Sequence, residues 1–303
     1  MRTIGIDLGS NTLRAVEYDC DRETFGPVFG TIVKTADGLA QTGLISQGAV
    51  ERIVEGLQRL RGTIVLDGAR MRAVTTEAMR RAHNREEVLA QIEARAGIRF
   101  EVIDGAEEAR LTLGAVQHRL AELGQDTNTT DALALVDIGG GSTELIFAYG
   151  ERIVSRSFPL GIVTITQSYD ALDAVREALP ELIAPVRTFA EETMSRYGSV
   201  DAFVATAGTP TTLASLKHGM EYATYDPRRI SGTRLHADEP ARHLEQLLAM
   251  PFAERERRVG VGRADLILAG IVLFEAFYAI LNQEECIVID DGLREGVALG
   301  LCV

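Results

Sequence analysis

The 303-residue chain carries 44 acidic and 31 basic side chains, and its formal net charge of −13 excludes the basic surface of a general nucleic-acid binder. Hydrophobic residues make up 46% of the sequence and charged residues 25%, which is typical of globular proteins and argues against a disordered chain. The length suffices for about two domains with a core in each.

The first predicted elements form a strand–turn–strand unit that occurs twice. An apolar strand ends in Asp7 and is followed by a glycine turn and a second strand over residues 14–18. The same plan recurs around Asp137, which lies 130 positions further on. The short strands that end at Thr76 and Thr206 are also 130 positions apart. Two matches at one offset predict a duplicated domain.

The rest of the first half alternates strands and helices. A third strand is predicted near residues 27–34, and Ser46 can cap a helix with apolar residues at helical spacing. Asn84, with a glutamate three residues later, predicts a capping-box start for the next helix. A strand over 100–103 and a helix from Glu107 follow.

The second half repeats this order, with strands over 144–149 and 152–158. The polar, turn-rich stretch 124–131 predicts the domain boundary, so we expect domains at 1–125 and 126–303. Two such halves predict an α/β fold of two mixed-sheet domains, with a ligand site in the cleft between them.

The apolar run 266–281 is near the lower length limit of a membrane span and contains Glu275, so we predict a buried core helix and no membrane association. A role of this helix in a homodimer is the alternative.

Cys20, Cys286 and Cys302 are odd in number, far apart and without metal spacing, which predicts reduced thiols in a cytoplasmic protein. Asp7 also interrupts any apolar leader at the N-terminus, so none is expected.

Both Asp–Gly turns have features of phosphate sites. Consecutive backbone N–H groups in a glycine turn form a nest for anions, and hydroxyl and amide side chains add donors. Asp7 and Asp137 are candidates to hold a hydrated Mg²⁺. The alternative for each turn alone is an ordinary hairpin turn. The candidate phosphate-binding residues are Ser10, Asn11, Gly139, Gly140, Gly141 and Ser142.

Three glutamates are candidates for chemistry. Glu144 lies in an apolar strand, where a carboxylate is costly unless it meets water, a metal or a partner; an outward-facing position is the alternative. Glu107 and Glu108 begin a helix, where acidic residues are also favoured by the helix dipole alone.

Eight ordered segments, taken together, resemble the exopolyphosphatase / guanosine pentaphosphate phosphohydrolase (Ppx/GppA) family almost from end to end. The segments around Glu107-Glu108-Ala109-Arg110 and Gly292-Leu293-Arg294-Glu295-Gly296 are the most specific to that family. The other segments lie at residues 6–12, 76–84, 136–145, 158–161, 207–209 and 263–265.

The resemblance implies two ribonuclease-H-like domains of the actin-like superfamily, with the last helix returning to the first domain. It implies that Glu108 is the general base, that Asp137 and Glu144 organise water and Mg²⁺, and that Arg80 holds the phosphoryl group. Arg263 would extend the anionic track. Phosphoryl transfer needs such charge neutralisation and positioning and little covalent help.

The activity implied is hydrolysis of the terminal phosphate of inorganic polyphosphate. Guanosine pentaphosphate hydrolysis, a non-catalytic polyphosphate or alarmone sensor, and an actin-like kinase are the alternatives.

Two departures from the family bear on the substrate. Thr164 stands where a basic residue is usual, and the chain ends at Val303, where many relatives continue into a helical domain, so short chains are expected to be preferred. Pro210 also removes one N–H donor from the turn that binds nucleosides in the superfamily.

Overall fold

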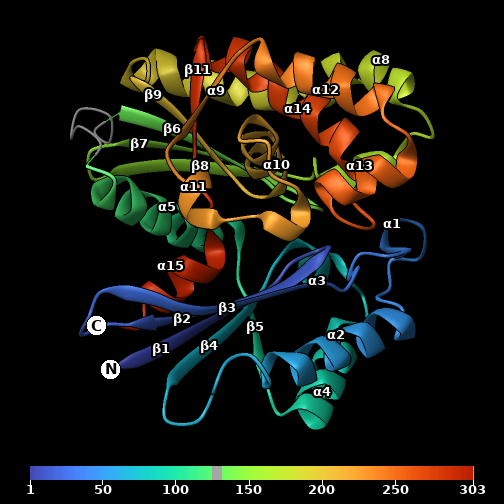
Figure 1. The fold of residues 1–303 in the computed structure, drawn as a ribbon, viewed down its shortest axis with the longest axis vertical. Coiled ribbons are helices and arrows are strands. Elements are labelled where there is room, and N and C mark those ends of the chain that lie inside the picture. The colour runs from blue at the N-terminus through green and yellow to red at the C-terminus, as the bar shows by residue number, and fades with distance from the viewer. Residues whose placement is uncertain (125–131, 303) are drawn as a thin grey trace. The chain divides into compact units, whose positions relative to one another are not determined.

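The computed structural model describes residues 1–124 and 132–302, which form two compact units (Figure 1). Unit 1 comprises Met1–Ala115 and Gly292–Val303, and unit 2 comprises Val116–Asp291. The predicted boundary at residues 125–126 lies outside the described residues.

Unit 1 is built on a five-stranded mixed sheet in the order β3-β2-β1-β4-β5. β1, β2 and β3 pair antiparallel, whereas β1, β4 and β5 run parallel, so the carboxyl ends of these three strands lie at one edge. The strands are β1 (Arg2–Leu8), β2 (Thr12–Asp19), β3 (Thr24–Ile32), β4 (Arg70–Thr75) and β5 (Phe100–Val102).

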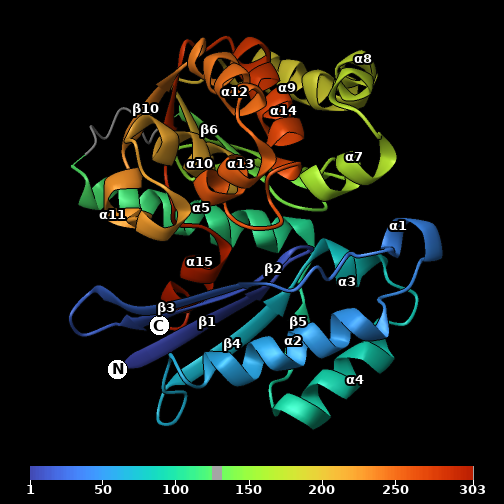
Figure 2. The ribbon, with the colours of Figure 1, turned by 45° about the vertical axis from the view of Figure 1, so that its right-hand side comes forward.

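Helices cover both faces of this sheet because the side chains of β1 alternate between them. Ile4, Ile6 and Leu8 are buried against α2 and α4 on one face. α15 lies on the other face of the sheet (Figure 2). There the Thr3 hydroxyl donates to Ala298 O of α15 at 2.9 Å. The helices of this part are α1 (Leu39–Thr42), α2 (Gln47–Leu60), α3 (Glu77–Arg81), α4 (Arg85–Ala96), α5 (Gly105–Glu122, which continues into unit 2) and α15 (Leu293–Leu299).

Unit 2 contains a six-stranded sheet in the order β10-β11-β9-β6-β7-β8. β6, β9 and β11 are parallel, and β6, β7 and β8 form an antiparallel meander. The strands are β6 (Ala132–Ile138), β7 (Thr143–Tyr149), β8 (Arg152–Phe158), β9 (Ala202–Thr206), β10 (Thr233–His236) and β11 (Glu285–Val288).

The core of unit 2 forms around α14 (Leu266–Leu281), whose aromatic residues Phe274, Phe277 and Tyr278 are buried. The prediction of a core helix is therefore confirmed. Across the described ranges, no helix combines the length and apolar character needed to span a membrane. The other helices are α7 (Ile162–Ser168), α8 (Leu172–Leu182), α9 (Ala184–Tyr197), α10 (Gly208–Lys217), the 3-10 turn η1 (Tyr222–Thr224), α11 (Pro227–Ile230), α12 (Glu239–Ala249) and α13 (Phe252–Val259).

The two units share one topology. The order β3-β2-β1-β4-β5 of unit 1 matches β8-β7-β6-β9-β11 of unit 2, which adds β10 at one edge. This agrees with the predicted α/β fold of two ribonuclease-H-like domains. The predicted equivalence of Thr76 and Thr206, however, is wrong. Asp7 lies opposite Val74 whereas Asp137 lies opposite Thr206, so Thr206 corresponds to Val74 and not to Thr76.

One helix start is predicted correctly and another is not. Ser46 caps α2 by accepting the N–H of Ala49 at 3.2 Å. Asn84 precedes α4 but makes no capping hydrogen bond. Its side-chain amide pairs with the backbone of Ile45, at 2.9 and 3.0 Å, because this tertiary contact satisfies both amide groups at once.

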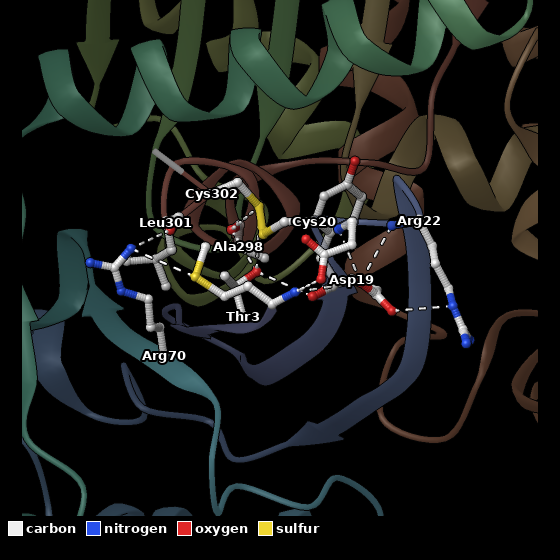
Figure 3. Close-up of a disulfide and its surroundings, with 11 residues drawn as sticks. Thr3, Asp19, Cys20, Arg22, Arg70, Ala298, Leu301 and Cys302 are labelled. Atoms are coloured by element: carbon white, nitrogen blue, oxygen red, sulfur yellow. Dashed lines mark hydrogen bonds and ion pairs between the residues drawn. A yellow bond between two sulfur atoms is a disulfide. The ribbon is translucent and has the colours of Figure 1, made fainter.

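The prediction of reduced thiols is wrong for two of the three cysteines. Cys20, just after β2, and Cys302, just after α15, form a disulfide with an S–S distance of 2.04 Å (Figure 3). The two residues are 282 positions apart, so only the return of α15 to the first sheet brings them together. Cys286 is buried and free, as expected.

Candidate functional site

The two Asp–Gly turns have the same backbone geometry. In unit 1 the N–H of Gly9 donates to Thr12 O at 3.0 Å, and in unit 2 the N–H of Gly139 donates to Ser142 O at 2.9 Å. Each turn joins the antiparallel pair that opens its sheet. The structure therefore confirms that the turns are equivalent.

The carbonyl groups of both turns are bound to neighbouring segments. In unit 1, Ser10 O and Asn11 O accept hydrogen bonds from the backbone that follows β3. In unit 2, Gly139 O and Gly140 O accept from the first residues of α7. This helix starts so close that a Cβ on Gly161 would lie 2.3 Å from Gly140 O, which explains the glycine there.

Several N–H groups of the turns form no backbone hydrogen bond in the described part of the chain. Within residues 1–124 and 132–302, the backbone N–H groups of Ser10, Asn11, Gly140 and Gly141 find no protein acceptor. Consecutive unbound N–H groups whose carbonyls are held away form a nest for an anion. Each unit thus has the geometry of a phosphate-binding turn.

The two aspartates differ in the residue opposite them on the next strand. Asp7 lies opposite Arg14, but Asp137 lies opposite Glu144. Like charges directly opposite each other on a sheet are destabilising. Glu144 is buried, so the outward-facing alternative is wrong, and its Oε1 accepts a hydrogen bond from Ser157 at 2.7 Å. A divalent cation would relieve this repulsion, and two carboxylates are ligands that Mg²⁺ prefers.

Asp7 also has an unusual electrostatic environment. Its Oδ1 is buried, and no described residue forms a hydrogen bond with it. Burial raises the pKa of Asp7 to about 6, although the charges of Arg14 and Arg294 lower it. Because Asp7 belongs to unit 1, the three-ligand set with Asp137 and Glu144 stays a prediction. The described residues contain no cluster of three or more His, Cys, Asp or Glu side chains that could hold a metal.

Glu108 and Arg80 lie in contact at the carboxyl ends of β4 and β5. Arg80 Nη1 donates to Glu108 Oε2 at 2.8 Å and to Ile103 O at 2.9 Å. Both side chains are largely buried, with 9% of Glu108 and 19% of Arg80 exposed. Glu107 instead points to Arg72, at 2.7 Å. The adjacent glutamates therefore occupy different environments, and only Glu108 joins the arginine predicted to hold phosphate.

Arg263 lies at the carboxyl end of β9 in unit 2. Its Nη2 donates to Gly208 O at 3.2 Å. Ala207, the residue before Gly208, has φ 72° and ψ −169°, a backbone conformation that is costly for any residue except glycine. The carboxyl end of β6, with Asp137, belongs to the same edge of this sheet because β6 and β9 are parallel. Gly208, which holds Arg263, and the Gly139–Ser142 turn therefore follow neighbouring strands.

Comparisons with known proteins identify the family of the chain. The Ppx/GppA phosphatase family matches residues 28–302. The chain belongs to this family. Exopolyphosphatase 2 of Mycobacterium tuberculosis is 27% identical over 321 residues, covering 99% of this chain and 95% of the relative. Exopolyphosphatase 1 of Mycobacterium leprae is 29% identical, covering 99% of this chain and 89% of the relative.

Two solved structures have the same fold as this chain. The Aquifex aeolicus enzyme is 31% identical with a TM-score of 0.75, and the match covers 99% of both chains. An exopolyphosphatase from Cytophaga hutchinsonii is 25% identical with a TM-score of 0.84, covering 100% of this chain and 98% of the other. The likeness in fold thus extends over nearly the whole chain.

Sequence reasoning missed two charged residues that contact or face the candidate residues Asp7 and Arg80. Arg14 was recognisable in principle, since the tight turn puts it opposite Asp7 on the same face of the hairpin. Glu77 lies three positions before Arg80, a spacing that brings side chains together on a helix. Its Oε2 accepts hydrogen bonds from both Nε and Nη2 of Arg80.

Proposed function

We propose that this chain is a Mg²⁺-dependent exopolyphosphatase that removes the terminal phosphate of inorganic polyphosphate, with a preference for short chains. The observation that carries the proposal is the matched pair of turns with unbound N–H groups, one in each unit. Each turn by itself offers donors to a phosphate oxygen, which is what recognition of a polyphosphate requires. The relatives named exopolyphosphatase support the same substrate class.

In the proposed reaction, Glu108 accepts a proton from the attacking water. The water oxygen forms a bond to the terminal phosphorus, the bond from that phosphorus to the bridging oxygen breaks, and the shortened chain keeps the bridging oxygen. Arg80 and the N–H groups of the turns stabilise the negative charge on the transferred phosphoryl group. When bound at Asp137 and Glu144, Mg²⁺ supplies further positive charge to the phosphate oxygens.

The preference for short chains rests on Thr164. Its N–H donates to Gly140 O at 3.3 Å, and its hydroxyl donates to Gly141 O at 3.5 Å. The residue therefore supports the glycine turn and adds no cation for a distant phosphate. A polyanion gains less from each added phosphate where such a charge is missing.

The test is phosphate release with Mg²⁺ from tripolyphosphate, long-chain polyphosphate, guanosine pentaphosphate and ATP. We expect release from polyphosphate, a higher kcat/KM for tripolyphosphate, and loss of activity with a chelator. Glu108→Gln should lower kcat by about 100-fold or more, as loss of a general base does. Glu107→Gln is the matched control, since its carboxylate binds Arg72 instead.

Each other outcome has a definite meaning. Release from guanosine pentaphosphate alone would replace polyphosphate with the alarmone as substrate. No release from any substrate, with binding retained, would make the chain a sensor. If Glu107→Gln abolished turnover and Glu108→Gln did not, the general base would be the wrong glutamate.

A second variant tests whether Arg263 binds phosphates of the substrate other than the reacting one. Because Arg263 is held at the carboxyl end of β9 through Gly208, we expect it to contact phosphates away from the reacting one. Arg263→Ala should therefore raise KM more than it lowers kcat. A pure loss of kcat would place Arg263 at the reacting phosphate.

A further inference from the structure

The guanidinium group of Arg80 is held on two sides by carboxylates. Its Nη1 faces Glu108 Oε2 at 2.8 Å, while Nε and Nη2 donate to a single oxygen of Glu77, Oε2, at 3.3 and 3.2 Å. The side chain of Glu77 is only 15% exposed. A charge-assisted contact of this kind is less screened by water than a surface ion pair.

The position of Glu77 explains how it reaches the arginine. It is the first residue of α3, two residues after β4 ends, and Arg80 follows one helical turn later. An acidic residue in a first turn is also favoured by the helix dipole. That effect does not require the carboxylate to meet the Nε–Nη2 edge of Arg80, because a side chain directed toward solvent would gain the same stabilisation.

The contact decides which edge of Arg80 faces Glu108. A guanidinium presents two edges that can each bind a carboxylate with two parallel N–H groups. With Glu77 on the Nε–Nη2 edge, Nη1 is directed at Glu108. Without Glu77, Arg80 can rotate and bind Glu108 through two N–H groups, which would make Glu108 a weaker base and pull the arginine from the phosphoryl group.

We propose that Glu77 is a positioning residue for the reaction, and that it orients Arg80 and, through Arg80, the carboxylate of Glu108. This inference rests on the proposed function. Glu77 touches neither water nor substrate in the reaction. Its effect therefore depends on Arg80, and this dependence can be measured.

The experiment is a double-mutant cycle on polyphosphate hydrolysis. Glu77→Gln is made in the wild-type chain and in Arg80→Lys, and kcat and KM are measured for all four proteins together with their thermal midpoints. We expect Glu77→Gln to lower kcat about tenfold with a smaller change in KM, since misplacing a catalytic group by a fraction of an ångström has effects of this order. In the Arg80→Lys background the same substitution should lower kcat less than twofold, because lysine has no second edge to orient.

Two further proteins separate positioning from stability. Glu101→Gln is the matched control, because its carboxylate binds Arg72 in the same unit at 2.8 Å and should leave kcat unchanged. Glu77→Ala, which removes the acceptor altogether, should lower kcat at least as far as Glu77→Gln. Both should retain a cooperative thermal transition.

The outcomes distinguish this inference from the proposed function. If the wild-type chain releases no phosphate, the proposed function fails. If the wild-type chain is active but Glu77→Gln matches it, or if the losses from Glu77→Gln and Arg80→Lys multiply independently, Glu77 is not a positioning residue. The inference would also be overturned if Glu77→Gln and Glu101→Gln lowered the thermal midpoint equally and lowered kcat equally. The loss of kcat would then reflect lower stability and not the position of Arg80.

Discussion

Reducing the disulfide between Cys20 and Cys302 should lower the free energy of unfolding. The bond ties the residue after β2 to the segment after α15, so the unfolded oxidised chain is closed into a loop of 282 residues (Figure 3). Reduction restores the conformational freedom of that loop in the unfolded state. It should leave the folded state nearly unchanged.

The magnitude follows from the length of the loop. Loop-closure entropy for a separation of 282 residues amounts to about 5 to 6 kcal/mol at room temperature in the chain-entropy model. Native disulfides usually contribute less, so we expect a measured loss of about 3 kcal/mol. In the folded state the C-terminal segment keeps other contacts: Thr3 donates to Ala298 O at 2.9 Å, and Arg70 donates to Leu301 O at 3.2 Å.

The assay is urea denaturation of the oxidised chain, the chain in a thiol-free reductant, and the variant Cys20→Ser/Cys302→Ser. The reduced chain and the variant should unfold at similar, lower urea concentrations, and the variant should not respond to the reductant. Cys286→Ser is the control, since this buried thiol is unpaired and its variant should still respond to the reductant. Equal midpoints for the oxidised and reduced chains would refute the reasoning, because the loop would then contribute nothing measurable.

Two substitutions test the packing of unit 1 and the electrostatics of unit 2. Gly5→Ala should destabilise unit 1 by about 2 kcal/mol or more, since its Cβ would lie 2.1 Å from Arg294 O, whereas Gly30→Ala in the same sheet meets no atom within 4 Å and serves as control in thermal melts. Burial raises the pKa of Glu239, but the hydrogen bond from Lys217, the backbone N–H of His236 and nearby positive charge outweigh it, so the pKa lies below its usual 4.5. Because the folded-state pKa is lowered, the carboxylate stabilises the fold above about pH 4.5 and loses this contribution as the pH falls. Glu239→Gln should therefore have a lower free energy of unfolding than the wild type near neutral pH, and this difference should shrink in acid. A difference that does not depend on pH would contradict the prediction.

Part of the candidate site could be predicted because it depends on local geometry. A strand, an aspartate and glycines close in sequence determine a tight turn, so residues around Asp7 and Asp137 could be compared without a fold. The same hairpin register puts Glu144 opposite Asp137. The wrong equivalence of Thr76 and Thr206 shows the limit of this approach. Distant strands pair in a register that their spacing along the chain does not determine.

The contact between Arg80 and Glu108 could not be derived from spacing. These residues are 28 positions apart, and their meeting requires β4 and β5 to lie side by side so that α3 and α5 begin at one edge. From spacing alone, Glu107 and Glu108 were equivalent first-turn acids. The fold separates them, since successive residues on a helix point in directions about 100° apart.

The sequence by itself determined the duplicated α/β plan, the two glycine turns and the buried helix α14, because hydrophobic periodicity and glycine act within a few residues. Only the tertiary structure decided which cysteines pair, which glutamate meets Arg80 and which edge of that arginine Glu77 holds. These contacts join segments between which the chain can take many paths. Their formation depends on the packing of whole sheets and helices, which no local pattern encodes.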